Sequence, residues 1–414
     1  MGLNQTPAAE RPHISFFGKR NAGKSSVMNA VTGQDLAVVS PVSGTTTDPV
    51  SKAMELLPLG PVMLTDTPGV DDSGELGALR VKKSYQVLAK TDCAVVVLDG
   101  TACPDADDLA LIRRIQEQQI PLLVVVNKAD LLPPEAAGNW PHAQTLCDTG
   151  IQPGQILVVS AATGAGIHAL KECIAAAAKG QENGRRIVAD LIAPDDLVLL
   201  VVPIDKAAPK GRLILPQQQT IRDILDCGAQ ALVVRETGLA QALAALARPP
   251  RLVITDSQVF GRVAAELPAD MPLTSFSILF ARYKGDLETV VRGVTALDRL
   301  QDGDRVLISE GCTHHRQCGD IGTVKLPAWI AEYTGKRLEF SFTSGTEFPD
   351  DLTPYRLVVH CGGCMLGERE MKYRLRCAAD QQVPMTNYGI LIAYVHGILP
   401  RSVEVFPQIR RLLR

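Results

Sequence analysis

The 414-residue sequence contains neither a long hydrophobic run nor an excess of basic charge. No apolar stretch approaches the ~20 residues needed to span a bilayer, and the N-terminus has no charged segment followed by an apolar one. The 42 basic and 45 acidic residues give a net charge of −3, so no overall positive field gathers phosphate backbones. We therefore expect a cytoplasmic protein that binds neither a membrane nor a nucleic acid.

The length exceeds what one hydrophobic core usually supports, which predicts two or three domains. A polar, glycine-flanked stretch at residues 180–186, and a segment bounded by Pro268 and Pro272, are typical of domain boundaries. They predict domains at residues 1–180, 185–267 and 268–414. No internal repeat or low-complexity tract is evident.

In the first domain, short apolar runs alternate with amphipathic stretches. The apolar runs are expected to be buried strands at residues 13–17, 62–65, 94–98, 122–126 and 156–159. The stretches between them have helical periodicity. This alternation predicts an α/β fold with a mostly parallel sheet and helices on both faces. The second domain repeats the pattern on a smaller scale without a phosphate loop, which favours a structural or dimerising module.

A phosphate-binding motif, Gly18-Lys-Arg-Asn-Ala-Gly23-Lys24-Ser25, follows the first expected strand. It lies between that strand and a helix, which is the context that this motif requires. Its glycines let backbone N–H groups face the phosphates, and the helix N-terminus adds its dipole. Lys24 is expected to bridge the β- and γ-phosphates, and Ser25 to give its hydroxyl to magnesium.

Two later segments indicate that the base is guanine. In Asn127-Lys128-Ala-Asp130 the Asp130 carboxylate can accept from guanine N1–H and from the N2 amino group, and adenine presents no such pair of donors. Loss of one partner of such a buried polar pair costs ~1–3 kcal/mol, which is enough for strong discrimination. Ser160-Ala161-Ala162 is expected to offer a backbone N–H to guanine O6.

Three further groups complete the expected nucleotide site. Asp66 is expected to hold the magnesium shell, and Gly69 to place its N–H against the γ-phosphate. Of the threonines at 45–47 we favour Thr46 as the γ-phosphate sensor and magnesium ligand. The expected catalytic residues are Lys24, Thr46, Asp66 and Gly69. The residues expected to bind the nucleotide are Gly18, Asn21, Ala22, Gly23, Lys24, Ser25, Ser26, Thr45, Thr46, Asp66, Gly69, Asn127, Lys128, Asp130, Ser160, Ala161 and Ala162.

These motifs, in this order, resemble GTPases of the TrmE and Era type, which modify tRNA or assemble ribosomes. The resemblance covers about residues 12–178. In those proteins an asparagine of the phosphate loop, matched here by Asn21, accompanies potassium-assisted hydrolysis. Val70 stands where many GTPases place a water-orienting glutamine, so hydrolysis is expected to be slow. The resemblance implies that K⁺, bound with the help of Asn21, accelerates it.

Clustered cysteines indicate a metal site, because thiols stay reduced in the cytosol and disulfides are rare there. Cys361-Gly-Gly-Cys364 follows an expected strand at 357–359. Cys312 follows another expected strand at 306–309, so the two turns are expected to converge. The histidines His314 and His360 belong to the same constellation.

The kind of metal stays open at this point, because two histidines with two or three cysteines also suit tetrahedral zinc. Three thiolates favour an iron–sulfur cluster. A cubane held by Cys312, Cys361 and Cys364 leaves its fourth iron without a thiolate. His314 or His360 is a candidate weak fourth ligand, and Cys318 competes for that role.

Together with the nucleotide site, this constellation resembles the HydF family, the maturation scaffolds of di-iron hydrogenases, over essentially the whole chain. That family has Cys-x-His followed by His-Cys-x-x-Cys, matched by Cys312-Thr-His314 and His360-Cys361-Gly-Gly-Cys364. The resemblance implies a P-loop GTPase domain, a small α/β dimerisation domain, and a C-terminal α/β domain that binds a 4Fe-4S cluster. It thereby implies a homodimer.

The resemblance also implies a function. The family accepts a di-iron precursor with carbonyl and cyanide ligands, made with the radical-SAM maturases HydE and HydG, and delivers it to apo-hydrogenase. GTP binding and slow hydrolysis would then shift domain arrangement and partner release. The alternative is an RNA-processing or ribosome-assembly GTPase with a structural zinc site, which the lack of a basic face disfavours. A radical-SAM enzyme is excluded because the sequence has no three-cysteine loop with the required tight spacing.

Overall fold

The structure is a computed structural model, and it describes residues 10–34, 49–69, 83–84, 86–133, 140–179, 184–204, 213–311, 320–345 and 347–413. The chain divides into two compact units, residues 1–183 and 184–414. Within the described ranges, no helix combines the length and the apolar character that crossing a bilayer requires.

The first unit contains a six-stranded sheet in the order β2-β3-β1-β4-β5-β6. Its strands are β1 His13–Phe17, β2 Val50–Leu56, β3 Gly60–Asp66, β4 Cys93–Asp99, β5 Leu122–Asn127 and β6 Ile156–Val158. All neighbours pair in parallel except β2, which pairs antiparallel with β3 at the edge. The central strands β4 and β5 are almost continuously buried, as expected of a sheet that is covered on both faces.

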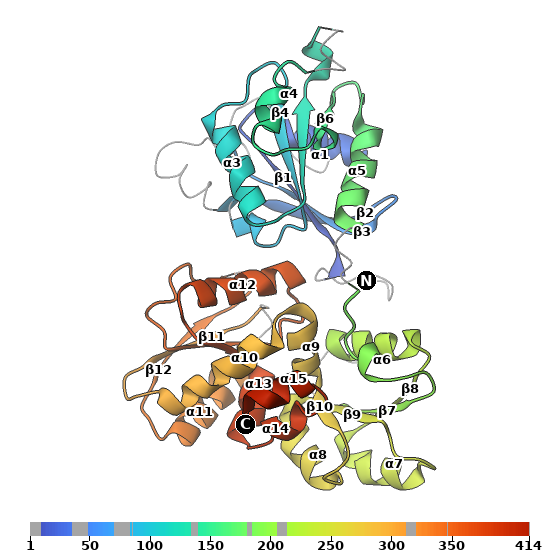
Figure 1. Cartoon of the computed structure of the whole chain (residues 1–414), viewed down its shortest axis with the longest axis vertical. Coiled ribbons are helices and arrows are strands. Elements are labelled where there is room, and N and C mark those ends of the chain that lie inside the picture. Colours follow the sequence, from blue (N-terminus) through green and yellow to red (C-terminus); the bar gives the residue numbers. More distant parts are fainter. Residues whose placement is uncertain are drawn as a thin grey trace. The chain divides into compact units, whose positions relative to one another are not determined.

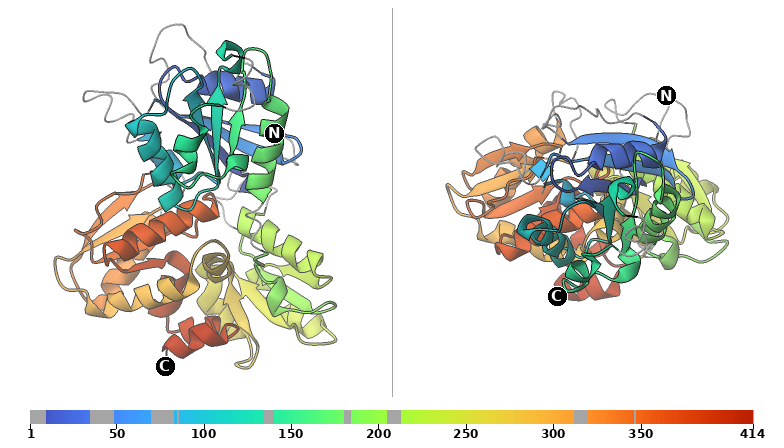
Figure 2. Two further views of the ribbon diagram at one scale, coloured as in Figure 1. Left: turned by 45° about the horizontal axis from the view of Figure 1, so that its top comes forward. Right: turned by 90° about the horizontal axis from the view of Figure 1, so that it is seen from above.

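Helices cover both faces of this sheet, as Figures 1 and 2 show. They are α1 Lys24–Thr32, α3 Ala106–Glu117, α4 Ala143–Cys147 and α5 Ile167–Lys179. Helices α1 and α5 share one core with β1 and β3. Helices α3 and α4 pack into a separate core on the other face of β4 and β5. The predicted α/β architecture with a mostly parallel sheet is confirmed.

The second unit contains two four-stranded, all-parallel sheets, ordered β10-β9-β7-β8 and β12-β11-β13-β14. The strands of the first are β7 Leu197–Val201, β8 Gln230–Val234, β9 Leu252–Thr255 and β10 Leu273–Ser275. The strands of the second are β11 Arg305–Ser309, β12 Glu339–Thr343, β13 Leu357–His360 and β14 Met385–Asn387. The sheet of β7–β10 extends past residue 267, the domain limit expected from sequence, because β10 pairs with β9.

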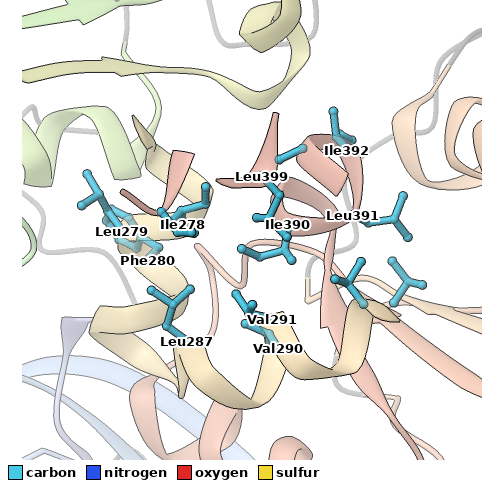
Figure 3. Packing of buried hydrophobic residues seen from close by; sticks show 14 of the residues in the cluster. Ile278, Leu279, Phe280, Leu287, Val290, Val291, Ile390, Leu391, Ile392 and Leu399 are labelled. Atoms are coloured by element: carbon cyan, nitrogen blue, oxygen red, sulfur yellow. The ribbon is translucent and has the colours of Figure 1, made fainter. Parts of the chain in front are cut away.

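One large core joins the two sheets of this unit. The helices are α6 Leu215–Asp226, α7 Leu239–Ala245, α8 Phe260–Glu266, α9 Phe276–Lys284, α10 Leu287–Val294, α11 Leu326–Thr334, α12 Glu368–Asp380, α13 Tyr388–Val395, α14 Leu399–Ser402 and α15 Pro407–Arg410. Figure 3 shows apolar side chains of α9, α10 and α13 meeting in this core. Helices α7 and α8 cover the opposite face of the β7–β10 sheet.

Candidate functional site

The phosphate loop (residues 18–25) has a backbone shape that its glycines make possible. Gly18 and Gly23 have φ values of +137° and +88°. A Cβ atom would lie 2.2 Å from the Val97 carbonyl oxygen at Gly18, and 2.2 Å from Asn127 Nδ2 at Gly23. Asn21 also has a positive φ, of 59°, a conformation that asparagine tolerates better than most residues. The loop therefore packs directly against the ends of β4 and β5.

Lys24, Ser25 and Asp66 gather at the start of helix α1. Lys24 is buried and donates to the Lys19 carbonyl oxygen at 2.6 Å. Ser25 Oγ donates to Asp66 Oδ2 at 2.5 Å. Burial raises the pKa of the Asp66 carboxyl, against the hydrogen bond from Ser25 and the charge of Lys24.

The donor set of Ser25 and Asp66 fits a magnesium ion. Asp66 is 1% exposed, and its Oδ1 atom has no hydrogen-bond partner among the described residues. A hard divalent cation coordinates carboxylate and hydroxyl oxygens of this kind. The buried, unpaired oxygen is where such an ion would compensate the cost of burial.

On the base side, Asn127 connects the phosphate loop to the segment at residues 160–162. Its Nδ2 atom donates to the Ala22 carbonyl oxygen at 3.1 Å, and its Oδ1 atom accepts from the Ala161 N–H at 3.1 Å. Asp130 is exposed, and its Oδ1 atom accepts from the buried Ser160 hydroxyl at 2.5 Å. Ser160 thus orients the carboxylate that was predicted to read guanine, a role that the sequence did not indicate.

Lys128 is held by a residue that sequence reasoning missed. Its Nζ atom lies 2.5 Å from Asp99 Oδ2, at the end of β4. The signal was present in the sequence, because Asp99 ends a buried apolar strand at the edge where the nucleotide motifs also lie. The predicted Thr45, Thr46 and Val70 lie outside the described residues, as do Cys312, His314 and Cys318.

The cysteine loop (residues 361–366) begins where β13 ends. The Cys361 N–H donates to the Ser309 carbonyl oxygen at 2.9 Å. The Cys361 sulfur accepts from the Gly311 N–H at 3.0 Å and from the Gly363 N–H at 3.4 Å. Gly311, which directly precedes Cys312 in the sequence, therefore contacts Cys361.

These contacts fit a thiolate ligand, because N–H groups directed at sulfur stabilise its negative charge and tune iron–sulfur clusters. Burial raises the pKa of the Cys364 thiol, although the nearby charge of Lys284 opposes the shift. Among the described residues, no three histidine, cysteine or acidic side chains gather as metal ligands. The third predicted cysteine, Cys312, is outside those ranges.

His360 is fully buried, and both of its ring nitrogens have partners. Arginine can only donate, so Arg374 Nη1, at 2.9 Å, donates to Nε2. Nδ1 therefore carries the proton and donates to the Cys361 carbonyl oxygen at 2.7 Å. Burial, with the charge of Arg374, lowers the pKa of His360 to about 3. A ligand role for His360 would require one of these bonds to break.

Arg374 is a second residue that the sequence did not reveal. It is 1% exposed, donates to Glu370 Oε1 at 2.6 Å and to the Gly345 carbonyl oxygen at 2.8 Å, and lies over the Phe348 ring. Its pairing with Glu370 spans one helical turn of α12. Arg374, held by Glu370, fixes the tautomer of His360. His360 in turn holds the Cys361 carbonyl oxygen in place through its Nδ1–H hydrogen bond.

Three family models match the chain. A model described as a 50S ribosome-binding GTPase matches residues 13–128. Models described as the dimerization domain and the tetramerization domain of hydrogen maturase F match residues 187–285 and 288–405. The matches therefore cover both units.

Two GTPases, MnmE and Der, are similar to this chain over less than half of its length. The tRNA modification GTPase MnmE of Desulfotalea psychrophila is 32% identical over 167 residues, 40% of this chain and 34% of that protein. GTPase Der of Synechocystis sp. is 29% identical over 194 residues, 45% of this chain and 42% of that protein. The chain thus spans less than half the length of these relatives. Among solved structures, Era of Aquifex aeolicus bound to GDP and aluminium fluoride aligns at 20% identity with a TM-score of 0.38, covering 54% of this chain and 92% of that one.

The buried Arg374–Glu370 pair beneath the cysteine loop should contribute to the stability of the second unit. Arg374→Met should destabilise the second unit by about 3–5 kcal/mol, because it leaves the Glu370 carboxylate buried without its partner. Arg374→Met/Glu370→Leu should recover most of that loss. Urea unfolding followed by Trp329 fluorescence, in a Trp140→Phe background, measures both. A single variant as stable as its parent, or a double variant no better than the single one, would contradict this account.

Proposed function

Because this chain belongs to the hydrogen maturase F (HydF) family, we propose that it is a GTP-hydrolysing scaffold for assembly of the di-iron hydrogenase cofactor. It receives the di-iron precursor with carbonyl and cyanide ligands from HydE and HydG, holds it on or near a 4Fe-4S cluster, and delivers it to apo-hydrogenase. The observation that carries this proposal is the presence of a phosphate loop and a cysteine loop in one chain, the latter within the region matched by the tetramerization domain.

The nucleotide half of the proposal is supported by the donor groups of the first unit. Lys24 binds the β- and γ-phosphates, Ser25 and Asp66 hold magnesium, and Asp130, oriented by Ser160, reads guanine. Bound magnesium supplies positive charge for the phosphate oxygens. Thr46 and Gly69 complete the γ-phosphate contacts in this proposal.

The cluster half is supported by the hydrogen bonds to the Cys361 sulfur and by the fold of the cysteine loop. We assign the cluster thiolates to Cys312, Cys361 and Cys364. His360 is engaged through both ring nitrogens, so His314 is the better candidate for a weak fourth ligand. A cluster bound in this way offers one iron to a cargo ligand. The protein acts as an oligomer, as the dimerization and tetramerization domains indicate.

Anaerobic reconstitution tests this function. The wild-type protein should take up about four iron and four sulfide per chain, the content of a cubane cluster. Cys312→Ala, Cys361→Ala and Cys364→Ala should each lose it, as read by iron and sulfide analysis and electron paramagnetic resonance. Cys377→Ala is the control, because Cys377 lies in α12 outside the constellation. Stoichiometric zinc with no uptake of a cluster would instead support the RNA-processing alternative.

Hydrolysis should depend on the monovalent cation. We expect GTP turnover at least about tenfold faster in K⁺ than in Na⁺, because the larger ion adds ~1.4 kcal/mol of transition-state stabilisation beside Asn21. Asn21→Ala should abolish the difference. Phosphate release at matched ionic strength measures both proteins. Equal wild-type rates in the two salts would refute the cation site and would leave the proposal of GTP binding intact.

Nucleotide state should change partner release. We expect nucleotide binding and partner binding to be coupled by ~1–3 kcal/mol. The rate of dissociation from HydE, HydG or apo-hydrogenase should therefore differ about fivefold or more between the GTP-bound and the GDP-bound protein. Surface plasmon resonance with each partner measures the rates, and Lys24→Ala serves as the control that cannot respond. Identical rates in both nucleotide states would remove the switch from the proposal.

A further inference from the structure

Lys284 is a buried lysine next to the cysteine loop. It is the last residue of α9 and is only 4% exposed. Lysines are almost never this deeply buried unless their charge is compensated. The site around Lys284 therefore has to supply strong acceptors.

Those acceptors are carbonyl oxygens of the cysteine loop. Lys284 Nζ lies 3.3 Å from the oxygen of Gly363, 3.2 Å from that of Cys364 and 2.9 Å from that of Leu366. An ammonium carries three N–H donors, so one side chain can bind all three carbonyls. Each carbonyl is thereby turned toward Lys284.

Bonds within the loop also help to fix this shape, and one of them is the Gly363 N–H donating to the Cys361 sulfur at 3.4 Å. A turn is closed by the Leu366 N–H, which donates to the Gly363 carbonyl oxygen at 3.1 Å. Gly363 has a φ of +62°, and a Cβ there would lie 2.7 Å from Met371 Sδ of α12. The loop thus lies between α12 and the ammonium of Lys284, and the ammonium binds the backbone on both sides of Met365.

We propose that Lys284 is a positioning residue that holds Cys361 and Cys364 ready for the cluster, and that its charge raises the cluster's reduction potential. This inference rests on the proposed function, because it requires a cluster at the cysteine loop. Reduction adds negative charge to the cluster, and a fixed positive charge nearby stabilises the reduced form. Buried charges act strongly because water screens them little.

Lys284 also connects the cysteine loop to the β7–β10 sheet. Helix α9 begins at Phe276, directly after β10, and the Ser275 hydroxyl caps it by accepting from the Ile278 N–H at 3.3 Å. The cysteine loop is therefore bound by the C-terminal end of helix α9, which starts at the β7–β10 sheet of the same unit.

Two variants of Lys284 distinguish the effect of its hydrogen bonds from the effect of its positive charge. Lys284→Met removes both, and Lys284→Gln keeps an N–H donor without the charge. Lys372→Met is the matched control, because it removes a positive charge from a side chain of α12 that is 39% exposed. Full-length proteins are reconstituted anaerobically, and circular dichroism confirms folding.

Redox titration followed by electron paramagnetic resonance measures the potential. We expect both Lys284 variants to lower it by about 59 mV, a tenfold change in a one-electron equilibrium. Lys284→Met should also lose iron about tenfold more readily to a competing chelator, as expected when a group that orients a ligand is lost. Lys372→Met should match the wild type in both measurements. If Lys284→Met does not fold, the potential of Lys284→Gln decides.

The outcomes separate the two proposals. Wild-type protein with a cluster, and Lys284 variants whose potential and chelator sensitivity match Lys372→Met, would overturn the role of Lys284 and leave the scaffold function intact. Wild-type protein that binds zinc and no cluster would refute the proposed function, and the role of Lys284 with it.

Discussion

Parallel strand pairing is the constraint on which both sites depend, because it brings the carboxyl ends of neighbouring strands to one edge of a sheet. In the first unit, β1, β3 and β5 deliver the phosphate loop, Asp66 and Asn127 to such an edge. In the second unit, β11 and β13 pair in register, with Ser309 opposite His360. The cysteine loop and Gly311 therefore meet just beyond that edge.

Buried polar side chains then fix the loops that lie at each of these sheet edges. Asn127 connects the phosphate loop to residues 160–162, so the segments proposed to bind the phosphates and the guanine base belong to one hydrogen-bonded unit. At the cysteine loop, Lys284 donates directly to backbone carbonyl oxygens. Arg374 donates to His360, which in turn donates to the Cys361 carbonyl oxygen. Such networks favour a single arrangement because leaving any member unpaired is costly.

Elements of the fold could be predicted from the sequence where a local residue pattern determines them. Contacts between residues far apart in the chain could not be predicted in this way. Buried strands such as β4 were predicted because continuous apolar runs mark them. Strand β2 was missed, because one of its faces is exposed and it lacks such a run. β10 and β14, of 3 residues each, are too short to show a period. Lys284 lies 79 residues before Gly363, so no motif connects the two.

Helix α9 has 9 residues and is therefore about 13 Å long, at a rise of ~1.5 Å per residue. Over that length, a tilt of about 5° about its first residue moves the far end by ~1 Å, a third of a hydrogen-bond length. A small rotation of the β7–β10 sheet would thus be enough to lengthen or shorten the hydrogen bonds between Lys284 and the cysteine loop. If Lys284 acts on the cluster as proposed, the geometry of the β7–β10 sheet and the chemistry of the cluster are coupled through this one helix.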